Sequence, residues 1–318
     1  MHRSSYPVLL FLGLLITLSV IFRSSQQSPQ SGESPTALPG TPQQIVPVEI
    51  PAQLDFAGEP VPLDITDVRE RLDRELLVNT YWHSNTLQLF KLASRWLSLI
   101  EKILQENGIP DDFKYMALAE SGFRNVVSPA DAVGFWQFLE GAAKDYGLEI
   151  SVTVDERYDP LLSTLAACRY LNDAYQEFGS WTLAAAAFNM GKKRLKSVLE
   201  EQKVTSYYEL YLNEETARYV FRVLALKEIF SNPQKYGFFI KPEDLYPPLK
   251  YRVVFVDYDI ADLAAFAQEN KTNYKTLRLL NPWLRKNYLK TQRGKVYQVR
   301  LPATDEDKTF SALSRKHG

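Results

Sequence analysis

Apolar side chains recur at the spacing of an α-helix through most of the stretch from residue 64 to residue 248. The clearest example runs from Leu89 to Leu104 in the i, i+3, i+4, i+7 pattern, and Asn107-Gly108 then ends the helix. Further helices are expected at residues 141–146, 161–178, 181–190 and 214–232. Because no alternating strand pattern interrupts these runs, residues 63–248 predict one all-α domain.

A smaller unit of residues 249–303 follows, ahead of a tail of residues 304–318. Strand patterns occupy Tyr251–Val256 and Lys295–Leu301, and helical patterns occupy Ile260–Glu269 and Tyr274–Leu280. Their order is βααβ. The expected fold class is therefore mainly α, with an all-α domain and a small βααβ domain.

The first 62 residues predict two segments outside these domains. Residues 6–22 form an apolar run of 17 residues preceded by Arg3, which fits a secretory signal or a short membrane anchor. No small-residue cleavage site follows, so residues 1–22 favour an uncleaved anchor, and in either case the remainder is expected to be exported. Residues 23–62 hold eight of the chain's 18 prolines and predict an extended tether.

Charge and metal-ligand content limit the possible partners. The chain has 37 Lys+Arg and 38 Asp+Glu, but residues 250–302 alone carry eleven basic and four acidic residues, a local charge of +7. This basic unit indicates either attachment to an anionic polymer or simply a solvated basic face. A single cysteine, Cys168, and three scattered histidines make a disulfide framework or a zinc site improbable. We expect no metal, no cofactor and no nucleic-acid partner.

Glu120 is the carboxylate that the local sequence singles out. A short helix is expected from about Asp112, which offers an acidic N-cap, to about Glu120, with Gly122 as its stop. The helix dipole at this end disfavours the carboxylate by only about 0.3–1 kcal/mol. A pKa suited to a general acid also needs desolvation, which nearby apolar residues can supply: Met116, Phe123, Phe135, Trp136 and Phe138. The alternative is a partly exposed Glu at a helix end.

Three further polar residues have both a structural and a functional interpretation. Asn189 follows a run of alanines near a helix end, where it either caps the helix or reaches a ligand. Tyr219 lies on the first turns of a helix that Asn213 caps, a position that is usually one of packing. Gln137 stands between two aromatic residues and either satisfies buried backbone or reaches into a groove.

Together these motifs resemble the lysozyme-like lytic transglycosylases, glycoside hydrolase family 23, which includes goose-type lysozyme. The resemblance covers residues 68–238. It runs through Arg69-Glu70-Arg71-Leu72, Gly108-Ile109-Pro110, Glu120-Ser121, Gly134-Phe135-Trp136-Gln137-Phe138, Asp155-Glu156-Arg157-Tyr158-Asp159-Pro160, Glu215-Thr216, Arg218-Tyr219-Val220 and Tyr236-Gly237-Phe238.

The resemblance implies a role for each matched residue. Glu120 would be the catalytic acid and base, and the substrate-binding residues would be Ser121, Gln137, Phe188, Asn189 and Tyr219. The sequence departs from the family pattern at three positions: Phe188 replaces a tyrosine, Lys192 follows Gly191 where Gly or Pro is common, and Asp131 replaces a small residue.

Residues 250–302 resemble a divergent LysM, a module that binds N-acetylglucosamine polymers, through Leu280-Asn281-Pro282 and Val299-Arg300-Leu301-Pro302. The implied substrate is the glycan strand of peptidoglycan on the periplasmic side of the envelope, with residues 6–22 in the inner membrane. The implied reaction cleaves the bond between N-acetylmuramic acid and N-acetylglucosamine without water and forms 1,6-anhydromuramoyl ends. The alternatives are a hydrolase in which Asp131 activates water and an inactive wall-binding scaffold.

Overall fold

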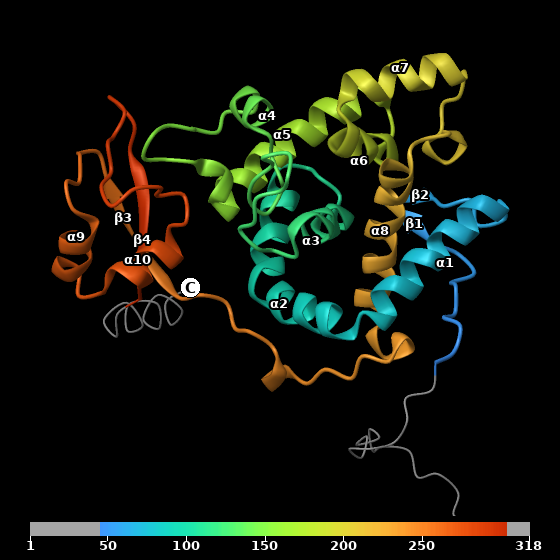
Figure 1. Ribbon diagram of the computed structural model, residues 1–318, viewed down its shortest axis with the longest axis horizontal. Helices are drawn as coiled ribbons and strands as arrows, with labels where there is room; N and C mark the ends of the chain where they lie inside the picture. The colour runs from blue at the N-terminus through green and yellow to red at the C-terminus, as the bar shows by residue number, and fades with distance from the viewer. Residues whose placement is uncertain (1–44, 304–318) are drawn as a thin grey trace, which may run out of the picture. The chain divides into compact units, whose positions relative to one another are not determined.

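The computed structural model describes residues 45–303 (Figure 1). An all-helical domain occupies most of this range, and a small two-stranded unit follows it. The helices of the first domain are α1 (Thr66–Tyr81), α2 (His83–Glu106), α3 (Lys114–Ser121), α4 (Glu140–Asp145), α5 (Pro160–Phe178), α6 (Trp181–Met190), α7 (Lys192–Gln202) and α8 (Glu214–Ser231). The expected fold class, mainly α with a helical domain and a small βααβ domain, is confirmed.

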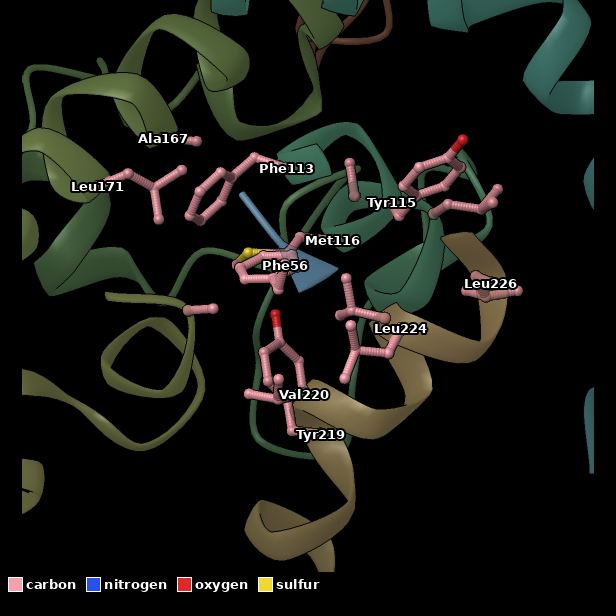
Figure 2. Packing of buried hydrophobic residues seen from close by; sticks show 14 of the residues in the cluster. Phe56, Phe113, Tyr115, Met116, Ala167, Leu171, Tyr219, Val220, Leu224 and Leu226 are labelled. Atoms are coloured by element: carbon pink, nitrogen blue, oxygen red, sulfur yellow. The ribbon is translucent and has the colours of Figure 1, made fainter. Parts of the chain in front are cut away.

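The helical core is built around α3 and α8. Helix α8 packs against α1, α3 and α6, and α5 packs against α2 and α6. Figure 2 shows part of this core, where Val220 and Leu224 of α8 lie near Met116 of α3. Met116 and Val220 are fully buried. Since α3 ends at the Glu120-Ser121 pair, this packing fixes the position of the proposed catalytic carboxyl.

The periodicity located these helices well, with two exceptions. The long helix before Asn107-Gly108, the helix ended by Gly122 and the Asn213 cap are all present, the Asn213 Oδ1 accepting from the Thr216 N–H at 3.0 Å. Helix α7 was not expected. Asp112 is not a helix cap, because its carboxylate accepts from the Ala57 N–H at 2.6 Å instead.

The expectation of an extended tether over residues 23–62 is wrong for residues 55–60. Residues 55–60 form a short hairpin of β1 (Asp55–Phe56) and β2 (Glu59–Pro60), and Phe56 is fully buried in the helical core. The Glu59 carboxylate accepts the Trp181 and Thr182 N–H groups at 2.6 and 2.9 Å, so it satisfies the N-terminus of α6. The folded domain therefore begins before residue 63. Residues 23–44 lie outside the described part.

The C-terminal unit has the expected βααβ order: β3 (Tyr251–Val256), α9 (Leu263–Glu269), α10 (Tyr274–Leu280) and β4 (Tyr297–Pro302). The strands are antiparallel, with Tyr251 opposite Pro302 and Val256 opposite Tyr297. Asn281 ties the unit together, because its side chain donates to the Arg300 carbonyl at 2.6 Å and accepts from the Arg300 N–H at 2.7 Å.

Two basic residues of this unit pair with buried carboxylates of residues 149–159. Arg300 makes a bidentate pair with Asp159 at 2.7 and 3.0 Å, and the two side chains are 7% and 1% exposed. Lys295 contacts Glu149 at 2.8 Å and Glu156 at 2.6 Å. Part of the local positive charge therefore neutralises buried acids rather than facing solvent.

The expected anchor at residues 6–22 lies outside the described residues. None of the helices between residues 45 and 303 combines the length and apolar character that a membrane span requires.

Candidate active site

Glu120 stands at the last turn of α3 because the chain turns sharply after it. Gly122 is left-handed (φ 61°), and its N–H closes the helix on the Leu118 carbonyl at 2.9 Å. The backbone angle favours glycine, and a Cβ at position 122 would lie 2.7 Å from Cδ2 of Leu89, whose side chain would have to move. The helix stop is thus set by residues adjacent to the carboxyl.

The environment of Glu120 favours its protonated form. Part of the side chain is accessible, but burial raises the pKa of its carboxyl to about 7. The Tyr219 hydroxyl and the Arg222 charge lower this pKa, and Glu215 raises it. A pKa near 7 lets one carboxyl act as an acid and then as a base at neutral pH. Desolvation is the largest cause of the raised pKa of Glu120.

A large open cavity of about 1050 Å³, here called the groove, lies on one side of Glu120. The four residues expected in the site that line it are Glu120, Gln137, Phe188 and Asn189. They come from α3, the loop at 126–138 and α6, and the fold brings them together from distant parts of the sequence. Aromatic side chains of the kind that line sugar-binding clefts contribute to the groove, together with polar and charged residues. The aromatic residues are Phe138, Tyr146, Tyr170 and Phe188.

Hydrogen bonds to its backbone carbonyls fix the conformation of the 126–138 loop. Gly134 (φ 83°) passes so close to Arg157 that a Cβ there would lie 2.0 Å from the Arg157 carbonyl oxygen. The Arg157 guanidinium donates to the carbonyls of Asp131 and Phe138, each at 3.3 Å. The side-chain N–H₂ of Gln137 donates to the carbonyls of Gly134 at 2.7 Å and Val126 at 3.2 Å. Its Oε1 is therefore the part of Gln137 left to accept from a ligand.

Phe188 and Asn189 form another part of the groove at the end of α6. The Phe188 ring meets those of Trp136, Phe138 and Tyr170 at centroid distances of 5.9, 5.5 and 5.1 Å. Asn189 is not the helix cap, because Gly191 holds that position. Its side-chain amide makes no hydrogen bond within residues 45–303, which leaves both its donor and its acceptor free toward the groove.

Ser121 does not have the expected role of a substrate contact. Its hydroxyl donates to the Phe135 carbonyl at 2.9 Å and lies 3.3 Å from the Ala117 carbonyl oxygen. The side chain is 9% exposed. Because its only proton is used inside the protein, Ser121 joins α3 to the 126–138 loop and positions Glu120.

Tyr219 does not line the groove either. It is 2% exposed, and Figure 2 shows it directed from α8 toward Met116. Burial and the neighbouring Glu120 hold the pKa of its phenol well above the usual value. No group in the described part of the chain meets its hydroxyl with hydrogen-bond geometry. Tyr219 therefore influences the pKa of Glu120 rather than contacting a ligand.

A second cavity of about 370 Å³, here called the arginine cavity, lies on the other side of Glu120. Glu120 lines both cavities. The charged residues of the arginine cavity, besides Glu120, are Glu75, Arg124, Arg218 and Arg222. The carboxyl thus stands where the two hollows meet.

The sequence analysis missed Tyr170 and Glu215 as groove residues and Arg222 beside Glu120. Glu215 belonged to a quoted motif and lies one helical turn before Tyr219, a spacing that places both on one face of α8. Asp131, the alternative second carboxylate, is exposed and belongs to the lining of neither cavity. The other carboxylates that line the groove are Asp145 and Glu215.

Comparison with known proteins agrees with this geometry. Residues 98–211 match the Transglycosylase SLT domain, a span that contains Glu120, Gln137 and Asn189. The chain carries an SLT domain. Residues 252–305 match the Soluble lytic transglycosylase C-terminal LysM-like domain. Both resemblances found in the sequence are thereby confirmed.

Known proteins similar in sequence match part of this chain. Membrane-bound lytic murein transglycosylase D of Escherichia coli (strain K12) is 29% identical over 191 residues, which are 57% of this chain and 41% of that protein. The putative tributyltin chloride resistance protein of Alteromonas sp. (strain M-1) is 31% identical over 113 residues, 35% of this chain and 55% of that protein. The chain thus spans less than two thirds of either relative.

Among solved structures, the 70 kDa soluble lytic transglycosylase from Escherichia coli matches 48% of this chain and 27% of that protein. Its identity is 21% and its TM-score is 0.37.

Proposed function

We propose that this protein is a peptidoglycan lytic transglycosylase with Glu120 as its acid and base. The observation that carries the proposal is a single carboxyl, with its pKa raised to about 7, at the edge of an aromatic groove. The match of residues 98–211 to the SLT domain supports the substrate class.

In the first step, protonated Glu120 donates to the oxygen between N-acetylmuramic acid and N-acetylglucosamine, and the glycosidic C–O bond breaks. The substrate's own N-acetyl group stabilises the positive charge at C1. Glycosidases that use two carboxylates hold them about 5–9.5 Å apart. Substrate assistance removes the need for a second carboxylate.

In the second step, the Glu120 carboxylate takes the proton of the C6 hydroxyl, whose oxygen attacks C1 and closes the 1,6-anhydro ring. No water is consumed. Gln137 Oε1 accepts from the sugar amide, Asn189 holds the N-acetyl group, and Phe188 supplies a ring face. Ser121 and Tyr219 position Glu120 and tune its acidity.

We also propose that the protein acts at the cell envelope, with residues 6–22 as its anchor and the LysM-like unit binding the wall. The name of the Escherichia coli relative, a membrane-bound murein enzyme, supports this location. Lys295 and Arg300 are used internally, so wall binding depends on the other basic residues of that unit.

Replacing Glu120 by Gln tests the catalytic assignment, because the shape is kept while the transferable proton is lost. We expect E120Q to release soluble fragments from purified peptidoglycan at a rate lower by roughly 10²-fold or more. The matched control is E215Q, which removes an exposed carboxylate of the groove and retains most of the activity. Binding to insoluble peptidoglycan without release by the wild type would indicate a scaffold instead.

A further inference from the structure

The arginine cavity has an excess of cationic groups next to Glu120. Its lining contains three guanidinium groups, of Arg124, Arg218 and Arg222, and one carboxylate besides Glu120, that of Glu75. When Glu120 is protonated, the cavity carries a formal charge of +2. This charge is unusual for a groove that binds neutral sugars.

One of the three arginines is fully engaged. Glu75 is 1% exposed and pairs with Arg218 at 2.5 Å, whereas its other oxygen is 3.9 Å from the Arg222 Nε. The Arg222 side chain is 35% exposed, so most of its donors remain free for a ligand.

Arg124 adds further hydrogen-bond donors to the arginine cavity. Its Nη2 donates to the neutral Gln88 at 2.8 Å, and its Nε is buried without a hydrogen-bond partner in the described part of the chain. No carboxylate among residues 45–303 pairs with Arg124. The ion pair of Arg222 is a long one, 3.9 Å, to the carboxylate that Arg218 already contacts at 2.5 Å, so Arg124 and Arg222 together leave positive charge uncompensated. Trp82, which is 59% exposed, adds an apolar wall to the same cavity.

We propose that the arginine cavity binds a carboxylate of the peptide attached to the N-acetylmuramic acid of the glycan strand. This inference rests on the proposed function. The cavity opens beside the carboxyl that would cut next to that sugar, and a guanidinium fork matches a carboxylate in shape and charge. The site would thus distinguish peptide-bearing strands from bare ones and hold the substrate by a substituent remote from the bond that breaks.

The test compares R222M with wild type on two substrates: peptidoglycan strands with their peptides, and stripped strands, whose peptide carboxylates have been converted to amides. Arg222 is the better target because removing Arg218 would leave Glu75 buried and unpaired. The matched control is R74M, since Arg74 is an exposed arginine of α1 that pairs with Glu214 outside the cavity. The full-length protein is used in detergent.

We expect kcat/KM of R222M on peptide-bearing strands to fall about tenfold more than on stripped strands, the effect of losing one charge-assisted hydrogen bond. The ratio between substrates separates this role from an effect of Arg222 on Glu120, which would lower both rates equally. An equal loss on both substrates would overturn the proposal.

A binding measurement keeps this result distinct from a failure of the proposed function. Calorimetry would compare two forms of the N-acetylglucosaminyl-N-acetylmuramoyl disaccharide tetrapeptide on wild type, R222M and R74M. One, here called the peptide form, has free peptide carboxylates, and in the other these carboxylates are converted to amides. Tighter binding of the peptide form that is lost only in R222M supports the anion site even if wild type cleaves neither strand. Equal affinity for the two disaccharides would refute the site whatever the catalytic result.

Discussion

The Ser121 hydroxyl donates to the carbonyl oxygen of Phe135 across 2.9 Å and joins the end of α3 to the 126–138 loop. The residue before it is Glu120, and the loop it holds carries Gln137. This single hydrogen bond therefore fixes the acid relative to one of the polar groups proposed to orient the sugar.

Replacing Ser121 by Ala should destabilise the protein. The buried Phe135 carbonyl would lose its donor, which costs about 1–3 kcal/mol in the free energy of unfolding. Urea denaturation measures this change, and S98A, an exposed position on α2, serves as the control with a change below about 0.5 kcal/mol. If S121A lost activity at unchanged stability, Ser121 would be a substrate contact after all.

The raised pKa of Glu120 predicts a pH-dependent gain of stability in E120Q. Between its ordinary value of 4.5 and about 7 the folded protein binds a proton that the unfolded chain releases, so wild-type stability falls as pH rises through this window. Gln carries no such charge. E120Q should match wild type at about pH 4 and exceed it by up to about 3 kcal/mol at about pH 8.

Urea titrations at several pH values follow this difference. E215Q, which removes a carboxylate that is exposed, should show no comparable trend. A constant difference between E120Q and wild type at all pH values would mean that Glu120 titrates normally.

The pH dependence of kcat/KM should report the same group. Because the protonated form of Glu120 starts the reaction, we expect activity to decline as pH rises above about 7. The Tyr219 hydroxyl lowers the pKa of Glu120, so Y219F should move this decline to higher pH. The test is to measure kcat/KM across the pH range at one ionic strength. If the decline of Y219F occurred at the same pH as that of wild type, Tyr219 would not influence the pKa of Glu120.

The pairing of Arg300 with Asp159 should be a major contribution to stability. R300M leaves a buried carboxylate without its partner, which costs about 3–5 kcal/mol. Adding D159N removes the stranded charge and should recover part of the loss in a double-mutant cycle. R293M, at an exposed arginine of the same unit, is the control. Independent, additive effects of R300M and D159N would contradict the pair.

Local sequence was sufficient to predict the helix stop at Gly122, because the residues responsible are adjacent, but it left both a desolvated and a partly exposed Glu120 as alternatives. It could not predict Arg222 beside Glu120 or Tyr170 in the groove, since tertiary packing brings them there from other helices. Charge counting found the basic C-terminal unit but could not show that Arg300 faces Asp159, 141 residues away.

The substrate contacts expected of Ser121 and Tyr219 could not be judged from the sequence for a related reason. A hydroxyl near a catalytic residue appears free in the sequence, and only the fold shows whether it is already engaged or buried. The boundary of the tether was misplaced because apolar residues such as Leu54, Phe56 and Val61 are interspersed with prolines and polar residues, and nothing local marks them as core.

Digestion of purified peptidoglycan in water labelled with oxygen-18 tests the central claim most directly. If Glu120 transfers the C6 hydroxyl proton and the ring closes on itself, mass spectrometry will find anhydro ends without the label, and E120Q will produce none. Reducing ends that each contain one labelled oxygen would show that water attacks C1, and would contradict the account.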